Sequence, residues 1–291
     1  MAIKSAFSRL ASVLVLALLG ACAAPTPQDR NATIDQLALA NGWHKVRLAT
    51  NAFALTAYVP DALPKTRQLT IYIEGDGLSW ESRYKPSADP TPVHATALEL
   101  AIKHPGAAVY LARPCQATAP ADWGRCNVQW WTSHRFGEPV IESSSQAIDQ
   151  LKAAAGAGRI VLVGYSGGGA VAALLAARRN DVDALVTVAG TLDHEWMSAH
   201  HKTDRLYGSL NPADMTAQLQ RVPQWHLMGG QDKIIPSELT RSFVSRLSRD
   251  APVRVEEVAD YGHQCCWADG WPPIARRVAD WAALRQASPG R

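Results

Sequence analysis

The chain has 291 residues, enough for one large domain or two small ones. Hydrophobic residues make up 47% and charged residues 19%, a globular composition that excludes disordered, collagen-like and polytopic membrane proteins. The net charge is only +3 and no block of like charge occurs, so the sequence predicts no nucleic-acid partner.

The first residues have the pattern of an export signal. Lys4 and Arg9 precede an apolar run, residues 10–19, that is too short to span a bilayer. The run leads into Leu-Gly-Ala-Cys, ending at Cys22, which resembles the lipobox of bacterial lipoproteins. The resemblance implies that residues 1–21 are removed and that Cys22 is lipidated. An ordinary signal peptide with an incidental Cys22 is the alternative.

Ala23, the residue after this cysteine, implies by the same resemblance sorting to the outer membrane, facing the periplasm. The stretch 23–34 (AAPTPQDRNATI) is rich in Ala, Pro and Thr and has no apolar periodicity. We therefore expect residues 22–40 to form a flexible tether between the membrane and the protein body. No repeat, change of composition or long linker follows, so residues 41–291 are predicted to be one domain.

Four further cysteines, Cys115, Cys126, Cys265 and Cys266, would lie in an oxidising compartment, where even numbers of cysteines pair. Three connectivities are open. Local pairing of Cys115 with Cys126 is favoured; the adjacent Cys265 and Cys266 either form a vicinal bridge or each reach back to one of the first two. Paired C-x-x-C spacing is absent, so a thiolate metal site is disfavoured.

From Trp43 onward, short β-rich segments alternate with helical ones, which is typical of a mainly parallel sheet with helices on both faces. Only two residues separate the first two segments, so these form an antiparallel hairpin. The expected strands are 43–49, 52–59, 69–73, 107–112, 159–163, 184–189, 223–228 and 253–258. The expected helices are 92–104, 141–155, 167–179, 212–220, 237–249 and 273–286.

A G-x-S-x-G motif lies at a strand-to-helix junction. Strand 159–163 leads into Gly164-Tyr165-Ser166-Gly167-Gly168, and an Ala-rich helix follows. At such a junction flanking glycines leave room for a strained serine backbone, and the serine Oγ is exposed above the sheet at a helix N-terminus. A helix-capping serine in a glycine-rich turn is the alternative.

A nucleophilic serine needs a base, and the base needs a carboxylate that fixes its tautomer. Asp232 and His263 each follow an expected strand, in the chain order Ser, Asp, His. Asp193, after the sixth strand, and Asp260 are the competing acids. Asp260 is too close in sequence to His263 to be the first choice.

With these motifs the sequence resembles the α/β-hydrolase superfamily over almost the whole mature chain. The resemblance implies the α/β-hydrolase fold, with a mostly parallel eight-stranded sheet, helices on both faces and a small cap. It also implies that Ser166 is the nucleophile, Asp232 the orienting acid and His263 the base.

The same resemblance places the oxyanion donors at the backbone N–H groups of Gly167 and Asp76. The sequence departs from the superfamily here, because many members have His-Gly where this chain has Glu74-Gly75. The carboxylates of Glu74 and Asp76 would oppose a developing oxyanion unless they point away or are paired. Glu74 as a mere strand-ending residue is the alternative.

Loops at the C-terminal ends of parallel strands line the crevice of such a sheet. We therefore expect substrate to contact Trp130 and Trp131 of the Trp-rich segment 113–138, together with Tyr165 and Trp80. A surface flap that packs its own small core is the alternative for segment 113–138.

Other chemistry-bearing residues have simpler interpretations. His200 and His201 lie near His194 without H-E-x-x-H spacing, so a solvated loop is expected rather than a metal site. His226 within a strand is expected to be a hydrogen-bonded core histidine, and no G-K-[ST] follows the glycines of the G-x-S-x-G turn. No cofactor or metal is predicted.

The sequence thus predicts a serine hydrolase that cleaves carboxylic esters, small-molecule acyl substrates, through an acyl-Ser166 intermediate. Small or medium acyl groups are favoured because residues 191–222 leave room only for a small cap. A peptidase or acyltransferase using the same triad is the first alternative. A membrane-anchored binding or scaffold protein without turnover is the second, favoured by Glu74 and Asp76.

Overall fold

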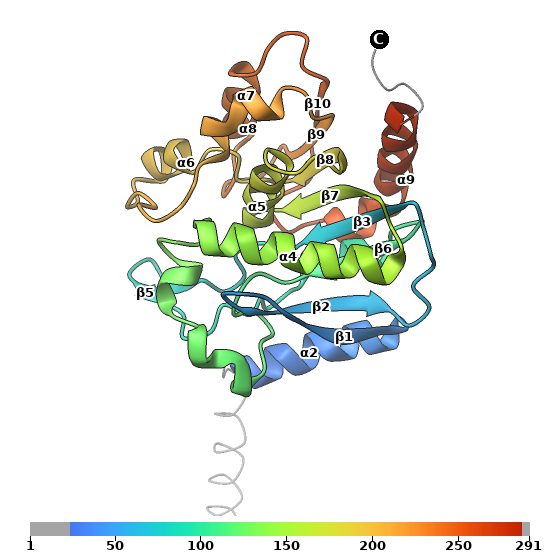
Figure 1. Cartoon of the computed structure of the whole chain (residues 1–291). Coiled ribbons are helices and arrows are strands. Elements are labelled where there is room, and N and C mark those ends of the chain that lie inside the picture. The colour runs from blue at the N-terminus through green and yellow to red at the C-terminus, as the bar shows by residue number, and fades with distance from the viewer. Residues whose placement is uncertain (1–23, 287–291) are drawn as a thin grey trace, which may run out of the picture.

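An eight-stranded sheet runs through the centre of the molecule (Figure 1). The computed structural model describes residues 24–286. The strands of this sheet are β1 (Trp43–Ala49), β2 (Ala54–Pro60), β3 (Gln68–Ile73), β6 (Ala108–Leu111), β7 (Arg159–Tyr165), β8 (Val182–Val188), β9 (Gln224–Gly229) and β10 (Val253–Val258). All eight expected strands are therefore confirmed, with ends shifted by no more than two residues.

The strands follow the order β1-β2-β6-β3-β7-β8-β9-β10. The predicted hairpin of β1 and β2 is confirmed as antiparallel, and β2 also pairs antiparallel with β6. The remaining pairs are parallel, so β3, β6, β7, β8, β9 and β10 all end at the same edge of the sheet. The segments that follow these strands meet at that edge.

Helices cover both faces of the sheet, and each face has its own apolar core. One core packs under α4 (Glu138–Ala155), α5 (Gly167–Ala176) and α8 (Ser237–Ser245), and Figure 1 shows α4 in front of the sheet. The other packs under α2 (Pro27–Ala40), α3 (Thr96–Ile102) and α9 (Trp267–Gln286). Successive side chains of β7 point to opposite faces of the sheet and so contribute to both cores. Ile160 and Leu162 pack in the first core, and Val161 and Val163 pack in the second.

Three smaller units surround the carboxyl edge. A hairpin of β4 (Trp80–Ser82) and β5 (Lys85–Pro86) follows β3. The segment after β6 contains two 3₁₀ turns, η1 (Pro120–Arg125) and η2 (Val128–Trp131), and a disulfide joins Cys115 to Cys126 in it. The segment after β8 forms the cap, made of α6 (His194–His201), η3 (Pro212–Met215) and α7 (Thr216–Leu219).

The expectation of a flexible tether over residues 22–40 is wrong from residue 27 onward, where α2 begins. Thr26 caps this helix through a reciprocal pair of bonds: the Asp29 N–H donates to Thr26 Oγ1 (3.2 Å), and the Thr26 N–H donates to Asp29 Oδ2 (2.9 Å). Such a capping box satisfies two N–H groups that the first helical turn leaves free. The helix start is therefore encoded locally, without apolar periodicity.

Helix α2 is also anchored to the body of the protein by buried side chains. Ile34 and Ala38 are 2% and 0% exposed and pack in the same core as Trp43 of β1. The buried Arg30 donates from Nε to the carbonyl of Thr91 (2.8 Å) and from Nη2 to that of Asp89 (3.0 Å). Residues 27–40 are therefore part of the folded domain.

The predicted signal segment 1–21 and Cys22 lie outside the described residues. Within residues 24–286, no helix is long and apolar enough to cross a bilayer.

Candidate active site

Ser166 stands at the turn between β7 and α5, at the carboxyl edge of the sheet. Its φ of +50° is in the left-handed region, which few side-chain-bearing residues adopt. The turn is too tight for other side chains: a Cβ at Gly164 would lie 2.3 Å from the Gly168 carbonyl oxygen, and one at Gly168 would lie 2.3 Å from that of Ile73. The glycines of the G-x-S-x-G motif are therefore sterically required.

The structure brings Ser166, His263 and Asp232 together, from the ends of three strands. His263 Nε2 lies 3.0 Å from Ser166 Oγ, and His263 Nδ1 lies 2.8 Å from Asp232 Oδ2. Because the Asp232 carboxylate accepts from Nδ1–H, Nε2 is left to accept the serine hydroxyl proton. This geometry is that of a serine nucleophile, a general base and an orienting acid.

Asp232 is held rigidly by its own backbone neighbours. Its side chain is fully buried, and Oδ1 accepts the N–H groups of Ile234 and Ile235, each at 2.8 Å. Hydrogen bonds to a carboxylate stabilise its charged form. The tight turn after β9 thus orients the Asp232 carboxylate toward His263.

The competing acids occupy other environments. Asp193 caps α6 by accepting the Trp196 N–H (3.1 Å), and it forms an ion pair with Arg246 (2.7 Å). Asp260 is exposed in the turn after β10. Asp232 is therefore the carboxylate that contacts His263.

Tyr165 positions His263 and does not line the cavity, contrary to the expectation that it contacts substrate. Its side chain is buried, its hydroxyl donates to the His263 carbonyl (3.0 Å), and its ring centroid lies 5.4 Å from the imidazole. The loop is fixed further by a vicinal disulfide between Cys265 and Cys266 and by a bond from the Gly262 N–H to the Cys265 carbonyl (2.7 Å).

The carboxylate of Glu74 points away from the serine into the protein. It is 1% exposed, and its Oε1 accepts the Gly75 N–H at 2.9 Å. Burial raises the pKa of Glu74 to about 7, because a charged carboxylate is poorly solvated there. Glu74 therefore shapes the loop beside Ser166 and adds little negative charge near it below neutral pH.

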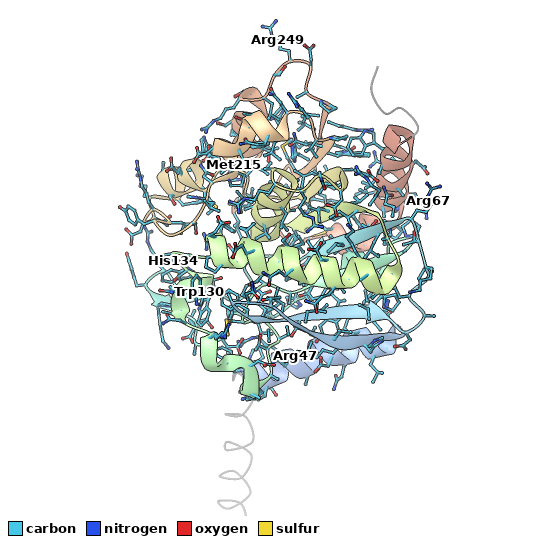
Figure 2. The ribbon with its side chains drawn as sticks, viewed as in Figure 1. Arg47, Arg67, Trp130, His134, Met215 and Arg249 are labelled. Carbon is cyan, nitrogen blue, oxygen red and sulfur yellow. A yellow bond between two sulfur atoms is a disulfide. The ribbon has the colours of Figure 1, made fainter. Side chains whose placement is uncertain are left out.

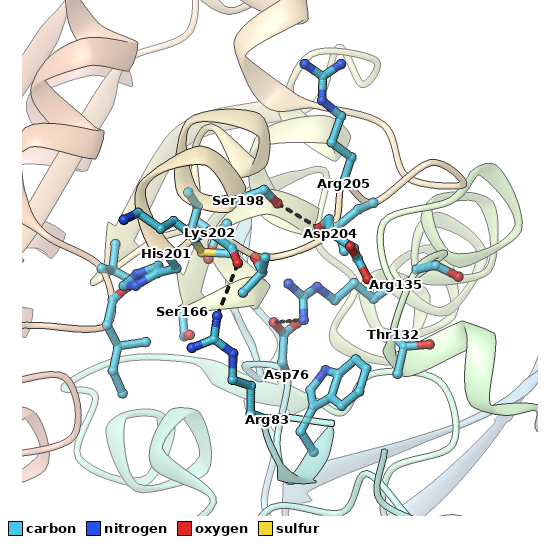
Figure 3. Close-up of a pocket in the computed structure, with 18 of the residues that line it drawn as sticks. Asp76, Arg83, Thr132, Arg135, Ser166, Ser198, His201, Lys202, Asp204 and Arg205 are labelled. Carbon is cyan, nitrogen blue, oxygen red and sulfur yellow. Dashed lines mark hydrogen bonds and ion pairs between the residues drawn. The ribbon is translucent and has the colours of Figure 1, made fainter. Parts of the chain in front are cut away.

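The carboxylate of Asp76 is paired by two arginines. Its Oδ1 lies 3.2 Å from Arg113 Nη1. Its Oδ2 lies 3.2 Å from Arg135 Nη1, and Figure 3 shows Asp76 and Arg135 side by side. It lies directly against Gly167, where an added Cβ would be 2.0 Å from Oδ1. The Gly167 N–H is the first of α5 and has no helical acceptor, so it is free to receive an oxyanion.

Arg113 and Arg135 are site residues that sequence reasoning missed. Both are nearly buried, with side chains 5% and 11% exposed, and both guanidinium groups lie over the ring of Phe136. Asp76 was the only sequence signal for these arginines, because a carboxylate beside a developing oxyanion requires positively charged partners. Which cations provide it depends on contacts between residues far apart in the chain.

A cavity of about 790 Å³ opens in front of Ser166. Trp80 lines it, as expected, whereas Trp130 and Trp131 do not. Trp131 is buried and donates from Nε1 to the Ser87 carbonyl (3.0 Å), and Trp130 packs edge-on against Phe53 and His134 (Figure 2). The Trp-rich segment instead contributes Thr132, Ser133 and Arg135 to the wall.

The histidines outside the triad form no metal cluster within residues 24–286. His226 is confirmed as a core histidine, fully buried and 2.8 Å from Thr187 Oγ1. The expectation of a solvated loop at His194, His200 and His201 is wrong, because these residues lie on α6 and His194 is buried. His200 stacks on Trp196, and His201 Nε2 lies 2.8 Å from the Ile234 carbonyl oxygen.

Comparison with known proteins agrees with this architecture. A family model described as the alpha/beta hydrolase fold matches residues 114–228, a segment that includes Ser166 and precedes Asp232 and His263. No curated protein is similar to the chain in sequence.

Several solved structures share the fold at low sequence identity. An esterase of Pyrococcus furiosus is 14% identical with a TM-score of 0.61, over 90% of this chain and 96% of the esterase. Est1E of Butyrivibrio proteoclasticus is 14% identical with a TM-score of 0.58, over 84% and 99%. A puromycin-hydrolysing peptidase of Mycobacterium tuberculosis is 16% identical with a TM-score of 0.59, over 84% of this chain and 39% of the peptidase. The chain therefore has the α/β-hydrolase fold.

Proposed function

We propose that this protein is a serine hydrolase of the α/β-hydrolase superfamily that cleaves carboxylic ester bonds through an acyl-Ser166 intermediate. The observation that carries the proposal is the continuous hydrogen-bonded series from Ser166 Oγ through His263 to the buried carboxylate of Asp232. Esterases among the proteins of similar fold are consistent with it.

Each step of the reaction has a group to perform it. His263 Nε2 takes the Ser166 proton as Oγ attacks the ester carbonyl, and the Asp232 carboxylate stabilises the resulting imidazolium. The N–H groups of Gly167 and Asp76 are the proposed donors to the tetrahedral oxyanion. His263 then protonates the departing alkoxide, and water, deprotonated by the same imidazole, releases the acid and restores Ser166.

The pairing of Asp76 supports turnover over a silent scaffold role. An unpaired carboxylate beside the oxyanion would oppose its formation, whereas two guanidinium groups within 3.2 Å neutralise this one. The departure of Glu74-Gly75 from the usual His-Gly is compatible with catalysis because the Glu74 side chain is directed into the core.

A fluorophosphonate probe tests the proposal, because it labels serines that are already activated by a base. We expect labelling of the purified domain, loss of labelling in Ser166→Ala, and a strong reduction in His263→Ala. Ser133→Ala is the matched control: Ser133 lines the same cavity and lies 2.8 Å from a histidine nitrogen, that of His134. No labelling of the folded wild type would refute the proposal.

Hydrolysis of a p-nitrophenyl ester and of the p-nitroanilide with the same acyl group separates esterase from peptidase chemistry. We expect turnover of the ester and little of the anilide. Efficient cleavage of the anilide would favour the peptidase alternative instead, and transfer of the acyl group to an added alcohol at the expense of hydrolysis would favour an acyltransferase.

We further propose that Cys22 is lipidated and that the domain is anchored to the outer membrane, facing the periplasm. The disulfide between Cys115 and Cys126 is consistent with an oxidising compartment.

A further inference from the structure

The cavity in front of Ser166 carries an excess of positive charge. Five cationic side chains line it, and only two carboxylates do, those of Asp76 and Asp204. The cations are Arg83, Arg135, Lys202, Arg205 and Lys233. The whole chain has a net charge of only +3, so positive charge is concentrated at this site.

Most of this positive charge is not neutralised by the protein. Asp76 is already shared by Arg113 and Arg135. None of Arg83, Lys202, Arg205 and Lys233 forms an ion pair with another residue of the described part of the chain. A concave site lined by unpaired cations attracts anions and raises their local concentration.

Arg83 is the cation best placed to contact a bound ligand. It extends from the β4–β5 hairpin across to the cap, where Nη2 donates to the Lys202 carbonyl at 3.3 Å (Figure 3). This is a long bond to a neutral acceptor, and hydrogen bonds from a guanidinium to an anionic oxygen are shorter and stronger. An anionic group entering the cavity would therefore compete well for these N–H donors.

Apolar side chains complete the lining. Met197 and Leu206 come from the cap region, Ile234 and Ile235 from the turn after β9, and Trp80 from the hairpin. The cavity thus combines an apolar surface for a hydrocarbon portion with cations for a charged end. Pockets of this kind bind ligands that carry both features.

We infer that the natural substrate is an ester that carries an anionic oxygen group, a carboxylate, phosphate or sulfate, separated from the scissile bond by a short apolar portion. Arg83 is the principal residue that recognises this group. The inference rests on the proposed esterase activity and specifies its substrate class.

Two esters of equal chain length test the inference: p-nitrophenyl hexanoate and the mono-p-nitrophenyl ester of adipic acid, in which a carboxylate replaces the terminal methyl. We expect the wild type to prefer the anionic ester in kcat/KM by about tenfold at low salt, and the preference to fall at high salt because exposed charges are screened. The ratio of the two kcat/KM values is the readout.

Variants of Arg83 connect the preference to this side chain. Arg83→Gln should lower the ratio about fivefold or more, and Arg83→Lys, which keeps the charge, should retain much of it. Arg249→Gln is the control, because Arg249 lies on the loop at the far tip of the molecule (Figure 2) and should leave the ratio unchanged.

The outcomes separate the inference from the proposed function. Hydrolysis of neither ester would refute both. Hydrolysis of both esters with a kcat/KM ratio near one, or with a ratio that Arg83→Gln does not change, would leave the proposed esterase activity intact. It would overturn the inference unless the vesicle experiment below shows a preference that depends on Arg83.

Fatty-acid release from phosphatidylglycerol vesicles, compared with release from phosphatidylcholine vesicles, identifies the source of the anionic group. A preference seen only there assigns the anion to a lipid headgroup, and one seen with the soluble esters assigns it to a free substrate.

Discussion

At the scale of single residues, the site depends on the position and hydrogen bonds of the Asp232 carboxylate, which differ from those of Asp193. Asp232 uses one oxygen for two backbone N–H groups and the other for His263. Asp193, which is also buried, uses its carboxylate to cap a helix and to pair with Arg246. Position, rather than burial or charge, therefore distinguishes Asp232, the proposed orienting acid, from Asp193.

Asp232→Asn is expected to lower kcat for ester hydrolysis by roughly 10³–10⁴-fold, because an amide no longer fixes the Nδ1–H tautomer of His263 or stabilises its imidazolium. Asp193→Asn is the matched control and should leave kcat per folded molecule within about threefold. Steady-state kinetics normalised to folded protein provide the measurement. Equal losses in both variants would contradict the assignment of Asp232.

Glu74 is expected to make stability depend on pH. Its pKa is raised from 4.5 to about 7 in the folded state by burial, so the stabilisation is complete below the unfolded pKa and is lost as pH rises through the folded one. Relative to Glu74→Gln, the wild type should lose on the order of 3 kcal/mol between about pH 4 and about pH 8.

Urea unfolding of both proteins across this range measures the difference. The buried histidines His104, His194 and His226 have lowered pKa values, chiefly through burial, in both proteins and cancel in the comparison. A wild-type to variant difference that stays constant with pH would show that Glu74 does not titrate as described.

The proposed triad residues could be named from sequence because each follows a β-rich segment and they occur in the chain order Ser, Asp, His. The residues that line the cavity could not be predicted in this way. Trp130 and Trp131 are in the expected segment, but which face of a loop packs inward depends on partners such as Phe53 and the Ser87 carbonyl, which are remote in sequence. Arg83 and Arg135 were missed for the same reason.

At the scale of elements, α2 shows what periodicity alone cannot detect. Its buried side chains include an arginine and an alanine, so no apolar stripe marks it in the sequence. Its start was nevertheless encoded, by Thr26 with Asp29 three residues later and by Pro27 in the first turn. The strands of the sheet, in contrast, are short β-rich segments between turn residues, apolar in the centre of the sheet and mixed with charged residues in β1 and β10, and could be predicted directly.

Two substitutions within α2 test whether this helix is integral to the domain. Ile34→Ala should lower the free energy of unfolding by about 2–4 kcal/mol, because it leaves a cavity in the core next to β1. Leu39→Ala, at a position 74% exposed on the same helix, should change it by less than about 0.5 kcal/mol. Equal and negligible effects in urea titrations would indicate that α2 does not pack on the sheet.

At the scale of the whole molecule, both faces of the sheet are covered and the proposed catalytic and binding groups gather at one edge. The two apolar cores use alternate residues of the same strands, so the sheet is a rigid support for loops of varied sequence. The proposed triad lies on the turns after β7, β9 and β10 of this support, and the hairpin, the Trp-rich segment and the cap provide most of the cavity wall.

The proposed anchor is also tested at this scale. Cys22→Ser should move the protein from the membrane fraction to the soluble fraction of a bacterial host and abolish incorporation of radiolabelled palmitate. Ser166→Ala, which alters only the site, should stay in the membrane fraction. Palmitate incorporation into Cys22→Ser would contradict lipidation at this residue.

The early start of α2 determines how far the domain can lie from the membrane. Only three residues lie between the proposed lipidated Cys22 and the capping Thr26, and the four residue steps that join the two span at most about 14 Å. The domain would thus be confined to a thin layer beside the lipid headgroups. Esters within that layer would meet the cavity at an effective concentration on the order of millimolar, whatever their concentration in bulk.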